Sequence, residues 1–225
     1  RKDKHGTFQL LKGVDKQKDQ SYVLHVLNQD TLQKTIFPLG EYTKDEVRDL
    51  AQDFNLSVAN RPDSQDLCFV GEQDYRDFLR RIAPQVEKPG PIFSIRGEQL
   101  GEHPGLAFFT IGQRKGLGLY APKPLYVLEK DLDQNALIVG SQDELGKKHL
   151  TARDVNWIAG VPPKHGFRAD VKIRYTAQPV KGTVIPQGEK QAKVDFDQQL
   201  FDITPGQAAV FYRGEVCLGG GIIKK

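Results

Sequence analysis

The sequence has few of the residues and patterns that mark several protein classes. It contains two cysteines, one tryptophan and no methionine among 225 residues. Two cysteines exclude a disulfide-stapled scaffold and indicate a reducing, cytoplasmic setting. No apolar run approaches the roughly 20 residues that a bilayer span needs, and no charged segment leads into an apolar signal-peptide region. We therefore predict a protein without a membrane partner. Because the chain lacks Met, we expect it to be a piece or a processed form of a longer product.

What is present is the composition of a globular protein, with 38% hydrophobic and 27% charged residues. The formal net charge of +3 is too small to indicate nucleic-acid binding by itself. Its distribution is uneven, because the net charge is +3 over residues 1–20, −4 over 21–148 and +4 over 149–225. A basic final third suits contact with phosphates, although an ordinary solvated surface is the simpler interpretation of charge alone.

The first third of the chain carries helical patterns. Thr43 and Glu46 have the spacing of a capping box, and an apolar face of helical period follows over residues 47–54. Another helix is predicted over 73–82, where the following proline ends it. Less regular helical turns are predicted over 22–36, with a break near 28–31.

Short strands dominate after residue 84. Residues 88–91 form a Pro/Gly breaker cluster, which is a candidate domain boundary. A β-hairpin is predicted from residues 125–129 and 136–139, and strict alternation predicts a strand over 169–175. Four more strands are predicted over residues 182–185, 192–196, 208–212 and 216–223. Their regular spacing predicts a small closed barrel.

The two cysteines lie in different contexts. Cys68 precedes the helix predicted over 73–82, where the unpaired amides of a helix N-terminus would stabilise a thiolate. Asp63 and Asp66 oppose that effect, and a buried structural cysteine is the alternative. Cys217 lies in a strand-like alternation, which indicates a small core residue. No Cys and His spacing predicts a metal site.

A glycine-rich loop over residues 112–118 contains the adjacent cations Arg114 and Lys115. Its backbone amides and cations suit a phosphate or a nucleic-acid backbone, but the spacing of a nucleotide-binding P-loop is absent. A simple β-turn between strands is an equally good interpretation.

The strand predicted over 169–175 also carries cations. Arg168, Lys172 and Arg174 share one of its faces with Asp170, and Tyr175 follows. Basic side chains beside an aromatic ring suit single-stranded RNA, through phosphate pairing and base stacking. The solvent-exposed face of a barrel strand is the alternative.

Five motifs occur in a fixed order along the chain. They are Lys18–Tyr22, Phe37–Gly40, Asp63–Phe69, Thr110–Gly118 and Pro205–Tyr212. In this order they resemble the family of tRNA-specific 2-thiouridylases, and the likeness runs from about residue 6 to residue 223. The resemblance implies a multi-domain α+β fold. It implies a helical remnant of an ATP-pyrophosphatase-type α/β domain over 1–84, a small central β-rich domain over 85–148 and a tRNA-contacting C-terminal β-barrel over 149–225.

The resemblance also implies an activity and its residues. Members of the family thiolate the wobble uridine of tRNA, using ATP with Mg²⁺ to adenylate the uracil oxygen and a cysteine persulfide to deliver sulfur. Cys68 resembles the persulfide carrier, which would be loaded by a sulfur-relay donor protein. The candidate tRNA contacts are Lys18, Asp19, Gln20, Arg174, Tyr175 and Gln207, together with Arg114 and Lys115 of the glycine-rich loop.

The sequence departs from the family pattern in three places. The family's ATP-binding loop, of the form SGGVDSS, is absent, so we expect the residues present to bind no ATP. The first catalytic cysteine is absent as well, which leaves open whether Cys68 forms a disulfide with it. Asp66 stands where the family usually has glycine. Two alternatives remain, namely a non-catalytic RNA-binding barrel module and a protein-interaction piece in which both cysteines are structural.

Overall fold

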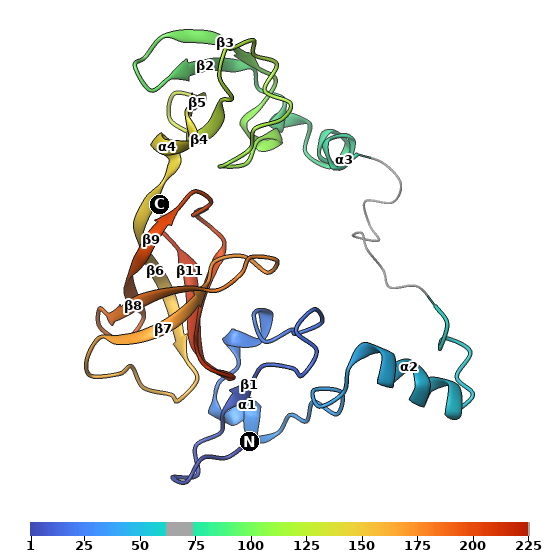
Figure 1. Ribbon diagram of the computed structural model, residues 1–225. Coiled ribbons are helices and arrows are strands. Elements are labelled where there is room, and N and C mark those ends of the chain that lie inside the picture. The colour runs from blue at the N-terminus through green and yellow to red at the C-terminus, as the bar shows by residue number, and fades with distance from the viewer. Residues whose placement is uncertain (62–73, 225) are drawn as a thin grey trace. The chain divides into compact units, whose positions relative to one another are not determined.

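The computed structural model describes residues 1–61 and 74–224, which form two compact units (Figure 1). The first unit contains residues 1–61, 148–199 and 204–224. The second contains residues 74–147 and 200–203. The N-terminal segment and the C-terminal strands share the first unit because they pack against each other.

The first unit is built around a closed antiparallel barrel of six strands. They are β6 (Lys147–Trp157), β7 (Phe167–Lys172), β8 (Val180–Pro186), β9 (Gln191–Leu200), β10 (Ala208–Arg213) and β11 (Val216–Ile223). The strand order is β11-β10-β7-β8-β9-β6, and the barrel closes because β11 also pairs with β6. The predicted C-terminal barrel is confirmed. Strand β6 was not predicted, because Asp154, with φ 52°, interrupts the alternation of buried and exposed residues along it.

Alternation along the strands separates the barrel interior from its outer face. On β7, Ala169 and Val171 are buried, whereas Arg168 is exposed. Side chains with no exposed surface continue the interior on the neighbouring strands, namely Val184, Ala192, Val194, Ala209 and Phe211. Burial of each large apolar side chain contributes about 1.5–3 kcal/mol, so this face holds the barrel together.

The N-terminal segment covers the outer face of two barrel strands. Strand β1 (Leu10–Leu11) pairs with the start of β11, and a 3₁₀ turn η1 (Val23–Val26) and a short helix α1 (Gln29–Gln33) follow. These elements bury a second apolar cluster outside the barrel, made of Leu10, Tyr22, Leu32, Ile158, Val210, Tyr212 and Cys217. The predicted break in the helical pattern falls at Asn28, whose side chain caps α1 by accepting from the Thr31 amide at 2.9 Å.

Helix α2 (Lys44–Asp53) begins at the predicted capping box. Glu46 accepts from the Thr43 amide at 2.7 Å, and the Thr43 hydroxyl accepts from the Glu46 amide. Both bonds satisfy amides that a helix N-terminus otherwise leaves unpaired. The predicted helix and its start are therefore confirmed.

The second unit contains a four-stranded sheet in the order β3-β2-β5-β4. Its strands are β2 (Gly90–Ser94), β3 (Gln99–His103), β4 (Tyr126–Asp131) and β5 (Ala136–Gly140), and the short elements α3 (Tyr75–Ile82), η2 (Pro84–Val86), η3 (Leu106–Phe108) and α4 (Gln142–Leu145) accompany them. The predicted hairpin is confirmed as β4 and β5, which pair antiparallel. Strands β2 and β5 pair in parallel, a long-range contact that local patterns do not predict.

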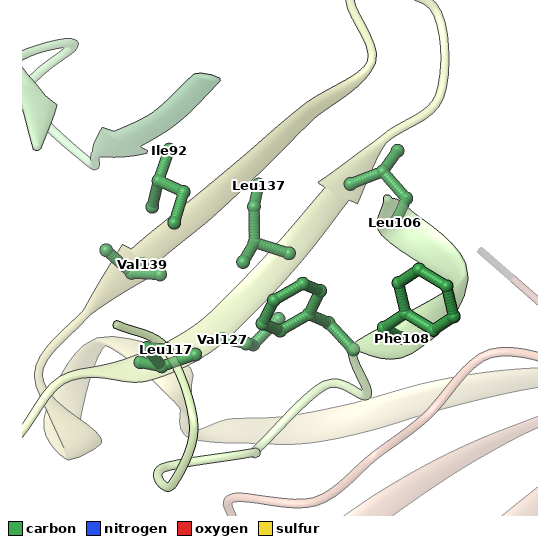
Figure 2. Packing of buried hydrophobic residues seen from close by; sticks show 8 residues of the cluster. Ile92, Leu106, Phe108, Leu117, Val127, Leu137 and Val139 are labelled. Atoms are coloured by element: carbon green, nitrogen blue, oxygen red, sulfur yellow. The ribbon is translucent and has the colours of Figure 1, made fainter. Parts of the chain in front are cut away.

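The core of the second unit joins the sheet to η3. Figure 2 shows Leu137 in the middle of this cluster, with Ile92 and Val139 on one side of it and Leu106 and Phe108 on the other. Helix α3 belongs to this unit as well, because its Leu79 packs against the cluster and the Tyr75 hydroxyl donates to the Phe108 carbonyl at 2.9 Å. The expected boundary at residue 84 therefore separates α3 from the unit on which it packs.

Three consecutive glycines in β11 allow its close approach to the neighbouring backbone. A Cβ at Gly219 would lie 2.1 Å from the Asn156 carbonyl oxygen, and the residue has φ 141°. A Cβ at Gly220 would lie 2.9 Å from the His25 ring, and one at Gly221 would lie 2.6 Å from the Arg153 carbonyl oxygen. The junction of β11 with β6 and η1 therefore requires glycine.

We expect Gly219→Ala to lower the free energy of unfolding by about 3 kcal/mol, because a backbone clash adds to a strained φ. Urea unfolding measures the effect. Gly188→Ala is the matched control, since Gly188 also has a positive φ (+79°) but a Cβ added there would meet no atom within 4 Å. It should cost only about 1 kcal/mol. Equal losses in the two variants would contradict the close-approach explanation.

Candidate functional site

Two segments far apart in the sequence meet on the outside of the barrel. The Gln20 side-chain amide donates to the Tyr175 hydroxyl at 2.7 Å. The rings of Tyr22 and Tyr175 are tilted by 60°, with centroids 6.2 Å apart. The structure thus joins the polar motif 18–22 to the end of the cation-bearing strand, two features that the residue patterns had left separate.

Alternation places the second segment. After β7 ends at Lys172, Ile173 is buried and Arg174 is half-buried. Tyr175 is 38% exposed, so one part of its ring faces solvent. Tyr22 is buried beside it and donates to the Ala208 carbonyl at 3.0 Å. Burial raises the pKa of Tyr22, so its phenol stays neutral and the pair is anchored to β10.

Two lysines lie against tyrosine rings at this place. The Lys172 ammonium is 5.8 Å from the ring centroid of Tyr22 and 5.4 Å from that of Tyr175. The Lys12 ammonium is 4.5 Å from the centroid of Tyr212 on β10. Such contacts attract a cation to the electron-rich ring face. We call these five residues the tyrosine cluster. Lys12, Tyr22 and Tyr212 were not predicted as site residues, since local patterns do not show which distant strand they meet.

Asp19 directs its carboxylate into the protein. Oδ1 accepts from the amides of Gly13 and Ser21 at 3.1 and 3.0 Å, and Oδ2 accepts from the Ser21 hydroxyl at 2.8 Å. That hydroxyl also lies 3.1 Å from the Tyr212 hydroxyl. The carboxylate therefore closes the loop 13–21 and ties it to β10. On either side of it, Lys18 and Gln20 are exposed.

Arg174 and Gln207 both form a hydrogen bond with Thr204. The Arg174 guanidinium donates to the Thr204 hydroxyl at 2.8 Å, and the Gln207 backbone amide donates to the Thr204 carbonyl at 3.2 Å. Gln207 is exposed and immediately precedes Ala208, which accepts from Tyr22. The structure thus groups the candidate residues of the first unit around the junction of β7 and β10.

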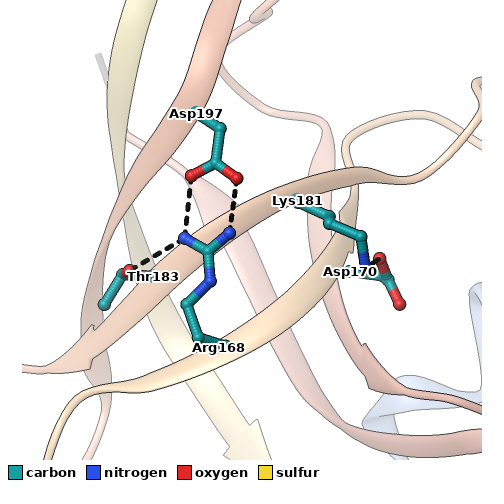
Figure 3. A network of polar contacts seen from close by, with 5 residues as sticks. All are labelled: Arg168, Asp170, Lys181, Thr183 and Asp197. Carbon is teal, nitrogen blue, oxygen red and sulfur yellow. Dashed lines mark hydrogen bonds and ion pairs between the residues drawn. The ribbon is translucent and has the colours of Figure 1, made fainter.

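Carboxylates neutralise the cations farther along the same outer face. Figure 3 shows Arg168 bound by both oxygens of Asp197 and by the Thr183 hydroxyl, and Lys181 paired with Asp170 at 3.3 Å. Asp197 raises the pKa of Arg168, and Arg168 lowers the pKa of Asp197. Arg168 is therefore held as a structural cation, bound to a carboxylate of the barrel.

The cations of the glycine-rich loop lie in the second unit. Arg114 and Lys115 are exposed in a loop between η3 and β4, and Gly112, Gly116 and Gly118 have φ of 83°, 73° and 69°. Arg114 lines an open pocket of about 400 Å³. The Gln113 backbone amide donates to the Thr110 carbonyl at 3.0 Å, so the loop contains a turn. This turn does not join two strands directly.

Of the two cysteines, only Cys217 lies within the described residues. Cys68 lies outside the described residues. Cys217 has no exposed surface, and burial raises the pKa of its thiol to about 12, so it is the core residue that was predicted. Within residues 1–61 and 74–224, no group of three His, Cys, Asp or Glu side chains could hold a metal ion. No helix in those ranges is long and apolar enough to cross a membrane.

We expect Asp19→Ala to lower the free energy of unfolding by about 1–3 kcal/mol, because two amides and a hydroxyl lose their acceptor. Asp19→Asn is the matched control, since its remaining carbonyl oxygen still accepts from the Gly13 and Ser21 amides. Urea unfolding followed by tryptophan fluorescence compares them. A loss of equal size in both variants would show that charge, rather than acceptor geometry, holds the loop.

Families of known proteins match this chain part by part. Three family models match successive parts of the chain: a tRNA methyl transferase HUP domain over residues 1–72, a tRNA methyl transferase PRC-barrel domain over 76–141 and an aminomethyltransferase beta-barrel domain over 147–223. All of helix α3 except its first residue, Tyr75, falls within the second match, in agreement with the packing of the helix. The third match covers the strands of the closed barrel.

Curated relatives match nearly the whole chain. The tRNA-specific 2-thiouridylase MnmA of Natranaerobius thermophilus is 45% identical over 218 residues, which cover 97% of this chain and 59% of the relative. The corresponding proteins of Symbiobacterium thermophilum and Carboxydothermus hydrogenoformans are 47% and 45% identical, with 98% and 100% of this chain and 56% and 61% of the relatives covered. The chain thus spans about three fifths of the length of these relatives, and it belongs to the family of tRNA-specific 2-thiouridylases.

Proposed function

We propose that this chain forms the tRNA-binding part of an enzyme that transfers sulfur to the wobble uridine of tRNA. The observation that carries the proposal is the meeting of residues 18–22 with residues 172–175 and Gln207. In a chain of this family, that meeting gathers an exposed tyrosine, an amide and several cations on one outer face of the barrel.

The chemistry of this face suits an unpaired RNA strand. The solvent-facing part of the Tyr175 ring offers a surface for stacking a base, and the Gln20 amide fixes the orientation of its hydroxyl. Lys18 and Arg174 are placed to meet phosphates, while Asp19 holds the loop that presents Lys18 and Gln20. Exposed Gln207 adds an amide that can donate and accept beside them. The Arg114 and Lys115 loop supplies candidate phosphate contacts on the second unit.

Sulfur transfer is proposed to run through Cys68. A donor protein's persulfide would pass its outer sulfur to the Cys68 thiolate, releasing the donor thiolate. In the complete protein, ATP would activate the uracil oxygen at C2, and the outer sulfur of the Cys68 persulfide would attack C2 while that oxygen leaves with the adenylate. A second cysteine thiolate, the family's first catalytic cysteine that is absent from residues 1–225, would then attack Cys68 Sγ, so that the S–S bond breaks, the sulfur stays on C2 and a disulfide forms. Within residues 1–61 and 74–224, loop 112–118 lacks the P-loop spacing, and no group of three His, Cys, Asp or Glu side chains could hold a metal ion. We therefore assign them no step with the nucleotide.

A non-catalytic RNA-binding module is the second candidate. The contact of Gln20 with Tyr175 and the Lys172 ammonium beside that ring suit this candidate as well, because an RNA-binding surface needs no reacting cysteine. The two candidates share the binding surface and differ only in whether Cys68 acts.

We expect Cys68→Ser in the full-length protein to abolish 2-thiouridine formation while tRNA binding is retained, because a hydroxyl cannot carry a persulfide. Mercury-gel retardation of tRNA measures thiolation. Cys217→Ala is the control and should keep the reaction, since this thiol is buried in the core. Unchanged thiolation in Cys68→Ser would contradict the catalytic role and favour the binding module.

We expect Tyr175→Ala to weaken tRNA binding by about 5- to 150-fold, the loss of one base-stacking contact of about 1–3 kcal/mol. Tyr175→Phe should retain most of the affinity, because it keeps the ring and loses only the bond from Gln20. Tyr42→Ala is the matched control, as Tyr42 is 43% exposed on the same unit. Filter binding gives the affinities. Equal affinities of Tyr175→Ala and the wild type would rule out stacking on this ring.

A further inference from the structure

The two lysines of the tyrosine cluster differ from the other barrel cations described above. Arg168 and Lys181 are paired with Asp197 and Asp170. Within residues 1–61 and 74–224, in contrast, neither Lys12 nor Lys172 has a carboxylate oxygen within 4 Å. Their ammonium groups are held instead against the rings of Tyr22, Tyr175 and Tyr212.

The carboxylate that attracts the Lys172 ammonium already accepts hydrogen bonds within its own loop. Asp19 attracts the Lys172 ammonium, but its two oxygens accept from Gly13 and Ser21 inside the loop. Burial lowers the pKa of Lys172 and the charge of Lys12 lowers it further, while Asp19 opposes both effects. Partial burial and a neighbouring like charge both destabilise the ammonium form. A bound anion would relieve that cost.

The anion's surroundings indicate its kind. Lys172 lies over the ring of Tyr175, whose solvent-facing part is the proposed base-stacking surface. In a nucleic-acid strand, each stacked base is flanked by phosphodiesters, and lysine binds such a group as a compact point charge with three donors. Resting on the proposed function, we propose that Lys12 and Lys172 together bind the backbone phosphate next to the base that stacks on Tyr175.

The salt dependence of tRNA binding by the full-length protein tests this pair. Each lost phosphate contact reduces the slope of log K against log salt concentration by about 0.7–1. Because both lysines contact one phosphate, we expect the double variant Lys12→Gln/Lys172→Gln to show that full reduction and each single variant to show part of it, whereas Lys172→Arg should keep the wild-type slope. Lys181→Gln is the matched control because it removes one charge from the adjacent strand β8, where Asp170 already neutralises it. It should leave the slope unchanged.

The outcomes separate this inference from the proposed function. If the wild type binds tRNA and both lysine variants keep its slope, the phosphate pair is wrong and the RNA surface stands. If the wild type does not bind tRNA, the proposed function itself fails. A third arm titrates inorganic phosphate: loss of phosphate binding in Lys172→Gln with an unchanged tRNA slope would show a free-anion site and overturn the assignment to RNA. Thermal unfolding of each variant identifies any that fails to fold, and Lys172→Arg then decides for that position.

Discussion

The packing of the N-terminal segment on β10 and β11 is the constraint on which the candidate site depends. Leu10 and Tyr22 from this segment are buried with Val210, Tyr212 and Cys217 from the barrel. Without that apolar contact, the motif 18–22 would have no fixed relation to residues 172–175, because about 150 residues separate them in the chain. The glycines of β11 allow the close approach, and the Asp19 network then determines which side chains face solvent.

Electrostatic pairing divides the outer face of the barrel into two parts. Arg168 on β7 pairs with Asp197 on β9, and Lys181 on β8 pairs with Asp170 on β7, so these charges cancel. Exposed pairs of this kind contribute little to stability, so their main consequence is to leave that end of the face nearly neutral. At the other end, aromatic rings hold Lys12 and Lys172 without cancelling their charge. Positive potential is therefore concentrated beside Tyr175 rather than spread along the strand.

Local patterns predicted local structure well. Thr43 and Glu46 predicted the start of α2, and the short strand patterns predicted β7 to β11. Both predictions succeeded because helix capping and period-two burial depend on residues that are close in the sequence. Long-range features were not accessible in this way. The parallel pairing of β2 with β5 and the return of β1 to β11 involve distant segments, and β6 was hidden by the left-handed Asp154.

The candidate site shows the same division. The cations on β7 and the polar motif 18–22 were each visible in the sequence, but the residue patterns did not indicate that they meet. Resemblance to a family grouped them as tRNA contacts without saying how they cooperate. The contact between Gln20 and Tyr175 supplies the physical link. Cys68 remains the residue whose role depends on the resemblance and on the proposed chemistry.

The three consecutive residues Lys18, Asp19 and Gln20 illustrate why the members of a motif are not equal contacts. A carboxylate facing an RNA backbone would repel it, and an exposed aspartate is a poor choice at such a place. The structure removes the difficulty, since the Asp19 oxygens accept hydrogen bonds from Gly13 and Ser21 inside the loop. The negative charge thereby fixes the loop and leaves Lys18 and Gln20 exposed. The middle residue of the motif thus acts through its neighbours, and its charge also opposes the lowering of the Lys172 pKa by burial and by Lys12.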